Sequence, residues 1–494
     1  MTGHAVWIPV AVLATPLVFA LVTLPVTTRV RKALWVAGSA VTLALALLQA
    51  RAVLLGGPIV ALGDEVRADG LAAVMAVLIS FLALACSVYA LAYLPGRHPR
   101  EPERGERLER RMPMFTALFL VLEFTLLWVV MTNNIVLLWV ALEATTLASA
   151  LLVSFYWDAR ALEAGYKYLL LLTVGITSAL FGCVLLYAAA APHLGSESAL
   201  LISNLGQVAD KIPPHIAIAA CLLLLVGFGT KAGLVPFHPW VADAHAEAPA
   251  VMSAFLSSVI IKVPFIGMLR VWSVFGPREP ALQDLLLWIG CATMVMGAAL
   301  AVSQDDLKRL HAYSSVSQVG YIAAAMGLGA PLGTYAAVFF IVSHALTKGL
   351  LFLSTGAVVY ATHETRSLAA LGGLRSRMPI TAACTLVGAL SLAGMPPFSG
   401  FVAKAQVVLA AAEGRAWIVL GIAVATGLVT MAYMTSMVQR VYRGAPPANG
   451  PALAEVREVP FAMQSGMALL AVAVLALGLR PQWIDALIGR AAGW

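Results

Sequence analysis

The sequence predicts an all-α, polytopic membrane protein with about fourteen transmembrane helices. Three observations support this prediction. First, 61% of the 494 residues are hydrophobic and only 11% are charged, whereas soluble domains carry roughly 25% charged residues. Second, apolar runs of about 20 residues, long enough to cross a bilayer, recur along the whole chain. Third, basic residues collect in alternate loops between these runs, which is typical of cytoplasmic loops.

The apolar runs follow one another with short polar breaks. They centre near residues 15, 43, 82, 122, 144, 178, 225, 260, 291, 321, 345, 393, 428 and 470. The first run, from about Ala5 to Val26, has basic residues after it and none before it, the reverse of a secretory signal. We therefore expect a retained span with its N-terminus outside. Each of the five cysteines lies inside a run and is expected to be a small core residue.

The basic residues predict the orientation of the chain. Loops after odd-numbered runs contain most of the lysines and arginines, including the clusters Arg29–Lys32, Arg97–Arg111 and Lys308–Arg309. Loops after even-numbered runs contain far fewer. This bias places both termini on the outer, periplasmic side of a cell inner membrane. We interpret the Arg/Glu-rich stretch Arg97–Arg111 as a solvated cytoplasmic loop.

Two of the predicted spans, the seventh and the twelfth, are interrupted by a similar pentapeptide of glycine, proline and phenylalanine. The seventh contains Gly233 and Pro236, and the twelfth contains Gly394, Pro396 and Pro397. Proline removes a backbone donor, and unpaired backbone at membrane depth is tolerated only where protein or water satisfies it. Because five spans separate the two sites, they run in opposite directions, which indicates an inverted repeat with broken helices. Ordinary proline kinks are the alternative.

Lysines, unlike arginines, lie inside the apolar runs. Four of the eight lysines do so, namely Lys231, Lys262, Lys348 and Lys404. A charge at the bilayer centre costs at least about 2.5 kcal/mol, and a buried lysine can release its proton whereas arginine stays charged. The choice of lysine therefore indicates that a change of protonation matters. For any single one of these lysines, a structural role in an ion pair is an equal alternative to proton transfer.

Acidic and imidazole side chains accompany these lysines. His344 lies four residues before Lys348, so that both share one helix face and can exchange a proton directly or through water. Glu143 lies in the middle of the fifth span and is a candidate partner that would hold Lys231 charged. Glu123, in the fourth span, extends or feeds the same path. Four lysines with a histidine and two acids favour a proton path over a purely structural role.

Weaker candidates follow the seventh span and precede the tenth. His238, Asp243 and His245 are expected either to form an interface or to assist the path. Their spacing lies in a loop without a clear metal geometry, so we predict no metal site. His311 is expected either to admit protons from the cytoplasm or to anchor the interface.

The sequence contains no motif for binding a nucleotide, an iron–sulfur centre or a dinucleotide. The glycines of Gly227–Gly233 lack the spacing of a phosphate loop, and no strand precedes them. No cysteine cluster suits an iron–sulfur centre and no strand–turn–helix suits a dinucleotide. We expect no bound cofactor, no catalytic residue and no nucleic-acid partner, so that any redox chemistry must lie on other subunits.

Three long segments, Gly233–Pro249, Asp306–Tyr321 and Gly394–Phe401, identify a family resemblance. With the glutamate of the fifth span and the His-x-x-x-Lys of the eleventh, the chain resembles the antiporter-like subunits of respiratory complex I, Mrp-type Na⁺/H⁺ antiporters and membrane-bound NiFe hydrogenases such as formate hydrogenlyase. The likeness covers roughly residues 110 to 440 and is closest to the hydrogenase and Mrp branch.

This resemblance implies fourteen helices with two inverted five-helix repeats, each providing a half-channel. The expected divisions are an N-terminal three-helix part with a charged loop (1–112), a first repeat (113–275), a second repeat (276–445) and a C-terminal helix (446–494). It further implies that Glu143 forms an ion pair with Lys231, and that Lys262 is the central connecting lysine.

The resemblance also implies that His344 and Lys348 serve the second half-channel, with Lys404 as the terminal charged residue. Two features depart from the family pattern. Leu142 replaces an aromatic residue before the glutamate, and Pro264 follows Lys262 closely and is expected to kink that helix.

The sequence thus predicts a proton-translocating subunit of a redox-driven membrane complex of the complex I or hydrogenase type. The alternatives are a Na⁺/H⁺ antiporter subunit and a membrane scaffold that conducts nothing. Expected partners are paralogous and other membrane subunits, peripheral redox subunits, lipid, and H⁺ or alternatively Na⁺. Whether the chain is part of an enzyme, and of which one, is left open.

Overall fold

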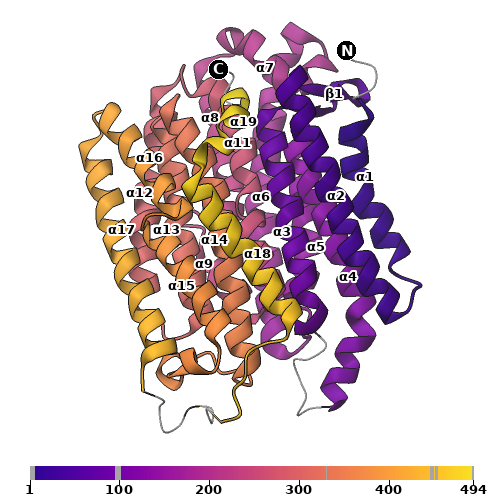
Figure 1. Ribbon diagram of the computed structural model, residues 1–494. Coiled ribbons are helices and arrows are strands. Elements are labelled where there is room, and N and C mark those ends of the chain that lie inside the picture. Colours follow the sequence, from indigo (N-terminus) through magenta and orange to yellow (C-terminus); the bar gives the residue numbers. More distant parts are fainter. Residues whose placement is uncertain (1–5, 95–101, 330, 446–449, 451–453, 492–494) are drawn as a thin grey trace.

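The computed structural model of the protein describes residues 6–94, 102–329, 331–445, 450 and 454–491. It is a bundle of roughly parallel helices with one short hairpin at one end (Figure 1). The predicted loop Arg97–Arg111 lies outside the described residues up to residue 101. From residue 102 onward the chain is already helical.

The first third of the chain forms long helices and the hairpin. Their bounds are α1 Trp7–Val22, α2 Thr28–Gly56, β1 Ile59–Ala61, β2 Val66–Ala68, α3 Gly70–Tyr93, α4 Pro102–Met131, α5 Ile135–Val153 and α6 Ala159–Leu194. The strands are antiparallel, with Ile59 opposite Ala68. Asp69 ends the hairpin and starts α3, because its carboxylate accepts a hydrogen bond from Ala72 N at 2.8 Å.

The middle of the chain contains the first broken helix. The bounds are α7 Ile202–Val208, α8 Pro214–Ala232, α9 Pro239–Glu247, α10 Ala250–Phe255, η4 Leu256–Ile260, α11 Val263–Phe275, α12 Pro280–Val302, α13 Leu307–Gly327 and α14 Leu332–Ala361. The segment η4 is a π-helix. Asp306 caps α13, since its carboxylate accepts from Lys308 N and Arg309 N at 2.8 and 3.0 Å.

The remaining helices contain the second break. Their bounds are α15 Pro379–Ala393, α16 Ser399–Glu413, α17 Trp417–Val438, the π-helix η7 Gln439–Arg443, α18 Phe461–Leu479 and α19 Asp485–Ala491. Short 3-10 turns occupy η1 Leu62–Asp64, η2 Ser198–Leu200, η3 Ala209–Lys211, η5 Leu368–Ala370, η6 Leu374–Ser376 and η8 Pro481–Trp483.

The helices are apolar and most are long enough to cross a bilayer. Within the described residues eleven helical segments have the length and composition of a membrane span, and α1 and α15 are shorter apolar helices. Every predicted centre of an apolar run falls in a helical segment. The near all-helical class is therefore confirmed, while the count of fourteen spans stays a prediction.

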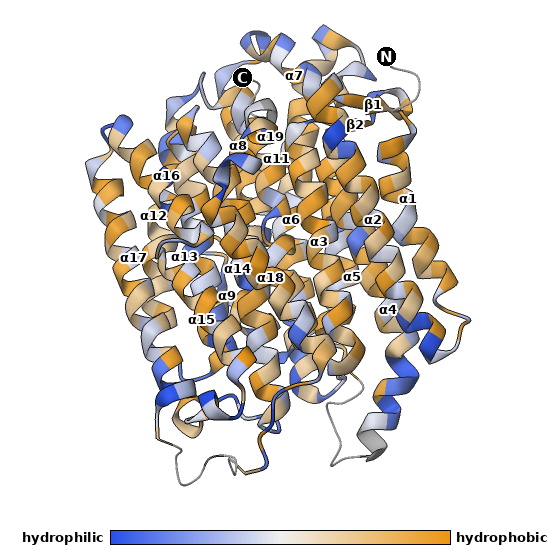
Figure 2. Ribbon diagram, in the orientation of Figure 1, coloured by the Kyte–Doolittle hydropathy of each residue, from blue (hydrophilic) through white to orange (hydrophobic). Residues whose placement is uncertain are grey.

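Polar residues gather at the two ends of the bundle (Figure 2). The start of α1, the hairpin, α7 and α19 lie at one end, and the start of α4 lies at the other (Figure 1). The apolar side chains between these ends form one continuous buried core. Any ionisable group inside this core lacks bulk water and must find its partners in the protein or in internal water.

Candidate functional site

The four lysines found inside apolar runs all point into the bundle. Lys231, Lys262 and Lys348 have no exposed surface, and Lys404 is partly buried with its ammonium nitrogen shielded. Lys308, which the sequence placed in a cytoplasmic loop, is also buried, at 1% exposure. That placement was wrong because α13 starts at Leu307 and carries Lys308 directly into the protein.

Lys231 lies in the last turn of α8 and reaches α5. Its ammonium group donates to Leu142 O at 2.7 Å and to Thr146 Oγ1 at 2.5 Å. Glu143 is the residue after Leu142 on α5. Its Oε1 accepts a hydrogen bond from Thr173 Oγ1 on α6 at 2.8 Å, and its Oε2 has no partner among the described residues. Lys231 and Glu143 are neighbours through Leu142, the residue of α5 before the glutamate, whose carbonyl accepts from the lysine. They form no direct ion pair, so the contact implied by the resemblance is replaced by backbone and hydroxyl oxygens.

Lys262 lies at the irregular turn between the π-helix η4 and α11. The π-helix breaks the regular hydrogen-bond pattern, and Lys262 donates back to Ser257 O inside it. Pro264 stands in the first turn of α11, where its missing N–H costs nothing. Ser257 also shares a hydrogen bond of 2.7 Å with Ser315 of α13. The break thus connects the middle lysine to α13.

Lys348, on α14, reaches the same helix. It donates to His311 O at 2.9 Å and to Ser314 Oγ, and it lies 5.9 Å from the ring centroid of Phe352. His245 stacks on that ring, with centroids 4.6 Å apart and planes 16° apart, and His311 lies 5.7 Å away. Phe352 is therefore surrounded by two imidazoles and an ammonium group.

His344 and Lys404 line one small cavity of about 10 Å³, roughly the space that one water molecule needs. Among the described residues, neither ring nitrogen of His344 has a hydrogen-bond partner, and the ammonium nitrogen of Lys404 has none either. The Lys404 nitrogen lies 5.4 Å from the ring centroid of Tyr321, a cation–π contact. The structure thus brings together the histidine of α14 and the lysine of α16.

The two helix breaks shape these surroundings. Gly233 and Gly394 end α8 and α15 in the left-handed conformation, which glycine adopts without strain. A Cβ on Gly394 would lie 2.9 Å from Lys404 Cδ, so this glycine makes room for the lysine stem. After the first break, Trp240 Nε1 donates to Thr230 O at 2.9 Å and satisfies one of the freed carbonyls.

The accessory candidates divide into two groups. His245 and His311 are fully buried, and none of their four ring nitrogens has a hydrogen-bond partner in the part of the chain that the structure describes. Asp243 instead belongs to an ion-pair network, with Arg309 at 2.9 Å and Lys167 at 3.7 Å. His238 is half-buried beside the break in α8–α9.

Glu123 lies apart from the lysines. It is fully buried between α4 and α2, where Ser39 Oγ donates to its Oε2 at 3.2 Å and its Oε1 has no partner among the described residues.

Lys308 is a buried group that the sequence analysis did not identify. It donates to Ala246 O at 3.2 Å and Ala248 O at 2.5 Å at the end of α9. Its position directly after the Asp306 cap was the signal that could have placed it inside a helix.

Comparisons with known proteins agree on one family. A family model described as NADH:quinone oxidoreductase/Mrp antiporter, transmembrane, matches residues 132–430. NADH-quinone oxidoreductase subunit N of Desulforudis audaxviator is 34% identical, over 87% of this chain and 85% of the relative. The hydrogenase-4 component F homolog of Methylacidiphilum infernorum is 33% identical, over 74% and 76%.

Solved structures show the same fold. A chain of the Mrp complex from Dietzia sp. has a TM-score of 0.86 and 25% identity, covering 99% of this chain and 96% of that one. A chain of respiratory complex I from Thermus thermophilus has a TM-score of 0.76 and 28% identity, covering 96% and 98%. These relatives are subunits of multi-subunit membrane complexes. Taken with its long apolar helices, this chain is a multi-pass membrane protein of the NADH:quinone oxidoreductase/Mrp antiporter transmembrane family.

Proposed function

We propose that this chain is a proton-translocating subunit of a redox-driven membrane complex, of the complex I or NiFe hydrogenase type. The observation that carries the proposal is the series of lysines and histidines with shielded nitrogens that runs from α8 through α13 and α14 to the partly buried Lys404 of α16. Buried ionisable groups are costly to keep in a membrane protein and mark ion pathways by default. No redox centre is proposed on this chain, because its electron carriers are expected on partner subunits.

The proposed path starts at Glu143 and Lys231, passes Lys262, continues through Lys348 and His344, and ends at Lys404. Ammonium and imidazole groups can each take up and release a proton. The hydrogen bonds of the described residues do not link these groups directly to one another. Because buried polar atoms need partners, we propose that internal water connects them, most clearly at the unpaired nitrogens of the histidines.

Fourteen spans and two inverted repeats belong to the same proposal. Counting α1, α13 and the broken pair α15–α16 as spans, beside the eleven long segments, gives fourteen. The left-handed glycines at the ends of α8 and α15 support corresponding positions in two repeats, 113–275 and 276–445. The N-terminal part (1–112) and the C-terminal helix (446–494) would flank them, in a cell inner membrane with both termini outside.

The test uses inverted membrane vesicles that contain the whole complex, with variants made in the chromosomal gene. We expect Lys231→Ala and Glu143→Ala to insert normally but to lower donor-driven vesicle acidification on the order of 10²-fold, as loss of a proton-transfer group does. The matched controls are Lys211→Ala and Glu197→Ala, which remove an exposed ammonium group and an exposed carboxylate. Full acidification by both buried-site variants would refute the path.

A Na⁺/H⁺ antiporter subunit is the second candidate, favoured by the likeness to the Mrp complex over 99% of this chain. Adding NaCl to vesicles that hold a pH gradient discriminates between the two. Sodium-dependent collapse of the gradient, lost in Lys231→Ala, would assign antiport. Unchanged proton flux in Lys348→Ala and Lys404→Ala variants would instead assign a scaffold role.

A further inference from the structure

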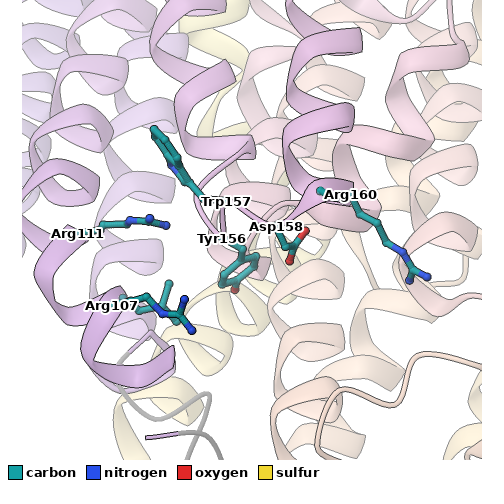
Figure 3. Close-up of a pocket in the computed structure, with 8 residues that line it drawn as sticks. Arg107, Arg111, Tyr156, Trp157, Asp158 and Arg160 are labelled. Atoms are coloured by element: carbon teal, nitrogen blue, oxygen red, sulfur yellow. The ribbon is translucent and has the colours of Figure 1, made fainter. Parts of the chain in front are cut away.

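A cavity of about 570 Å³ lies where α4 begins and α5 passes into α6. Its described lining contains arginines and aromatic residues and none of the buried lysines. Its lining includes Arg107 and Arg111 of α4 together with Trp157 and Asp158 of the α5–α6 turn (Figure 3). By the distribution of basic residues this is the cytoplasmic end of the bundle. We refer to it as the basic cavity.

The basic cavity has an excess of positive charge. Arg107 and Arg111 are four residues apart on α4 and therefore share one face. Arg160 also contributes to the lining, although its guanidinium is turned to the far side of Asp158 (Figure 3). Asp158 is the only acid in the described lining, and its Oδ1 caps α6 by accepting from Ala161 N at 2.9 Å, so the lining has three arginines and a single carboxylate. Within the described residues Arg111 has no carboxylate partner.

Trp157 positions Arg111 at this surface. The Arg111 guanidinium carbon lies 4.9 Å from the centre of the indole ring, a cation–π contact that leaves the N–H groups at the guanidinium edge available. Trp157 is held with a φ of 55°, a conformation uncommon for a large side chain, and its side chain is 49% exposed. Tryptophan near the end of a membrane-spanning helix is typical of the boundary between headgroups and acyl chains.

From this arrangement we propose that the basic cavity binds the phosphate of an anionic phospholipid from the adjacent leaflet. Arginine forks match phosphate oxygens in a bidentate manner, and basic pockets at the cytoplasmic ends of helices bind anionic headgroups. The flanking helices present apolar side chains outward, with Leu147 and Leu151 of α5 and Leu162 of α6 between 44% and 54% exposed. These residues offer acyl chains a surface that a free phosphate ion would not use.

The experiment measures lipid retention by the full chain, purified in detergent, with native mass spectrometry. Phosphatidylglycerol is titrated against phosphatidylcholine with the same acyl chains, and inorganic phosphate is added in a separate arm. We expect wild-type protein to prefer phosphatidylglycerol. Arg107→Gln/Arg111→Gln should weaken that binding on the order of tenfold, because each basic residue near an anionic surface contributes measurably to affinity.

The matched control is Arg29→Gln/Arg440→Gln, which removes the same charge from two exposed arginines at the same predicted side, away from the cavity. It should bind like wild type. Equal binding by the cavity variant and wild type, or equal loss in the control, would overturn the proposal. Displacement of the lipid by inorganic phosphate at equal concentration would overturn the lipid source. Arg107→Lys/Arg111→Lys, which keeps the charge, should retain part of the affinity and thereby exclude misfolding as the cause.

Discussion

The buried ammonium groups are held by uncharged oxygen atoms. Lys231 donates to a carbonyl and a threonine hydroxyl, Lys262 to a carbonyl, and Lys348 to a carbonyl and a serine hydroxyl. A neutral amine can still donate to the same oxygens, so each lysine can release its proton without losing its position. A direct carboxylate contact would instead favour the charged form strongly. This arrangement suits groups that change protonation.

The first prediction concerns Lys348, where the path crosses from α13 to α14. Lys348→Ala should abolish donor-driven acidification of vesicles, and Lys348→Arg should not restore it, because guanidinium keeps its proton. Both variants are compared with Lys211→Ala, an exposed lysine of η3. Acidification is followed by the quenching of a fluorescent amine. Normal acidification with arginine would show that position 348 needs only a charge.

The second prediction concerns an ion pair outside the membrane-spanning segments. Arg278 Nε donates to Asp210 Oδ1 at 2.6 Å and lowers the pKa of that carboxyl below its ordinary value. Because the pKa of Asp210 is lowered in the folded protein, the ion pair stabilises the folded state at pH values above the ordinary pKa of the carboxyl. This stabilisation is lost as the pH falls through the lowered pKa of the folded protein. Both side chains are exposed, so the effect is small.

Arg278→Gln should therefore reduce the hydrogen-exchange protection of the neighbouring α7, Ile202–Val208, at pH 7, and this difference from wild type should shrink as the pH falls through the lowered pKa of Asp210. Asp210→Asn should have the same effect at pH 7, and the double variant should add nothing further. Protection is measured by mass spectrometry after correction for the intrinsic exchange rate at each pH. A difference that keeps its full size on acidification would contradict the assignment.

Sequence reasoning located the titratable residues but not their partners. A lysine inside an apolar run stands out in the sequence because its cost in the membrane demands a reason. The partners do not stand out, since they are backbone carbonyls such as Leu142 O and His311 O that any residue could supply. For the same reason the interaction of Glu143 with Lys231 was predicted as a direct ion pair, whereas the carboxylate binds Thr173.

Among the elements, α12 and α13 lie in unusually close contact. A Cβ on Gly290 would lie 2.4 Å from Ala324 N, and one on Gly297 would lie 2.2 Å from Ser317 N. Gly320 and Gly327 on α13 meet the backbone of α12 in the same way. Small residues let membrane helices approach until their backbones touch. This contact fixes the helix that carries His311, Ser314 and Ser315.

The third prediction tests this contact with a single methyl group. Gly297→Ala should destabilise the protein by about 1–3 kcal/mol, as overpacking does, and lower the thermal midpoint in detergent. The control is Gly421→Ala on α17, where nothing lies within 4 Å of the added Cβ and the gain in helix propensity should make the change neutral or stabilising. Equal midpoints for the two variants would show that α12 and α13 can separate at no cost.

The helices were predictable to different degrees. Long apolar runs and the Gly/Pro pentapeptides are sufficient by themselves to indicate α8–α9 and α15–α16. The hairpin β1–β2 and the short α7 have too few residues for a periodic signal. The π-helix η4 was also unpredictable, because Leu256–Ile260 has the pattern of a regular apolar helix, and only Pro264 indicated an irregularity nearby.

On the scale of the whole molecule, contacts between distant segments build the site. Lys231 meets a residue 89 positions earlier, and Lys348 meets one 37 positions earlier. The helices that supply these residues contribute to one buried core, in which α13 and α14 pack directly against each other. Apolar periodicity predicts that each helix spans the membrane, but it does not specify its neighbours, since lipid and protein interiors are equally apolar. The family resemblance supplied that arrangement.

The last prediction concerns the orientation of the whole bundle, which follows from the charge bias of the loops. Single cysteines can report it in the natural background, because all five native cysteines are buried. With both termini outside, Gly56→Cys at the end of α2, Ser196→Cys after α6 and Gly414→Cys after α16 should react with a membrane-impermeant maleimide in intact spheroplasts. Glu106→Cys at the start of α4 and Ser376→Cys in η6 should react only after the membrane is opened. These five positions alternate between the two ends of the bundle along the chain, so an inverted orientation would reverse every one of them, whereas a miscounted span would reverse only those that follow the error.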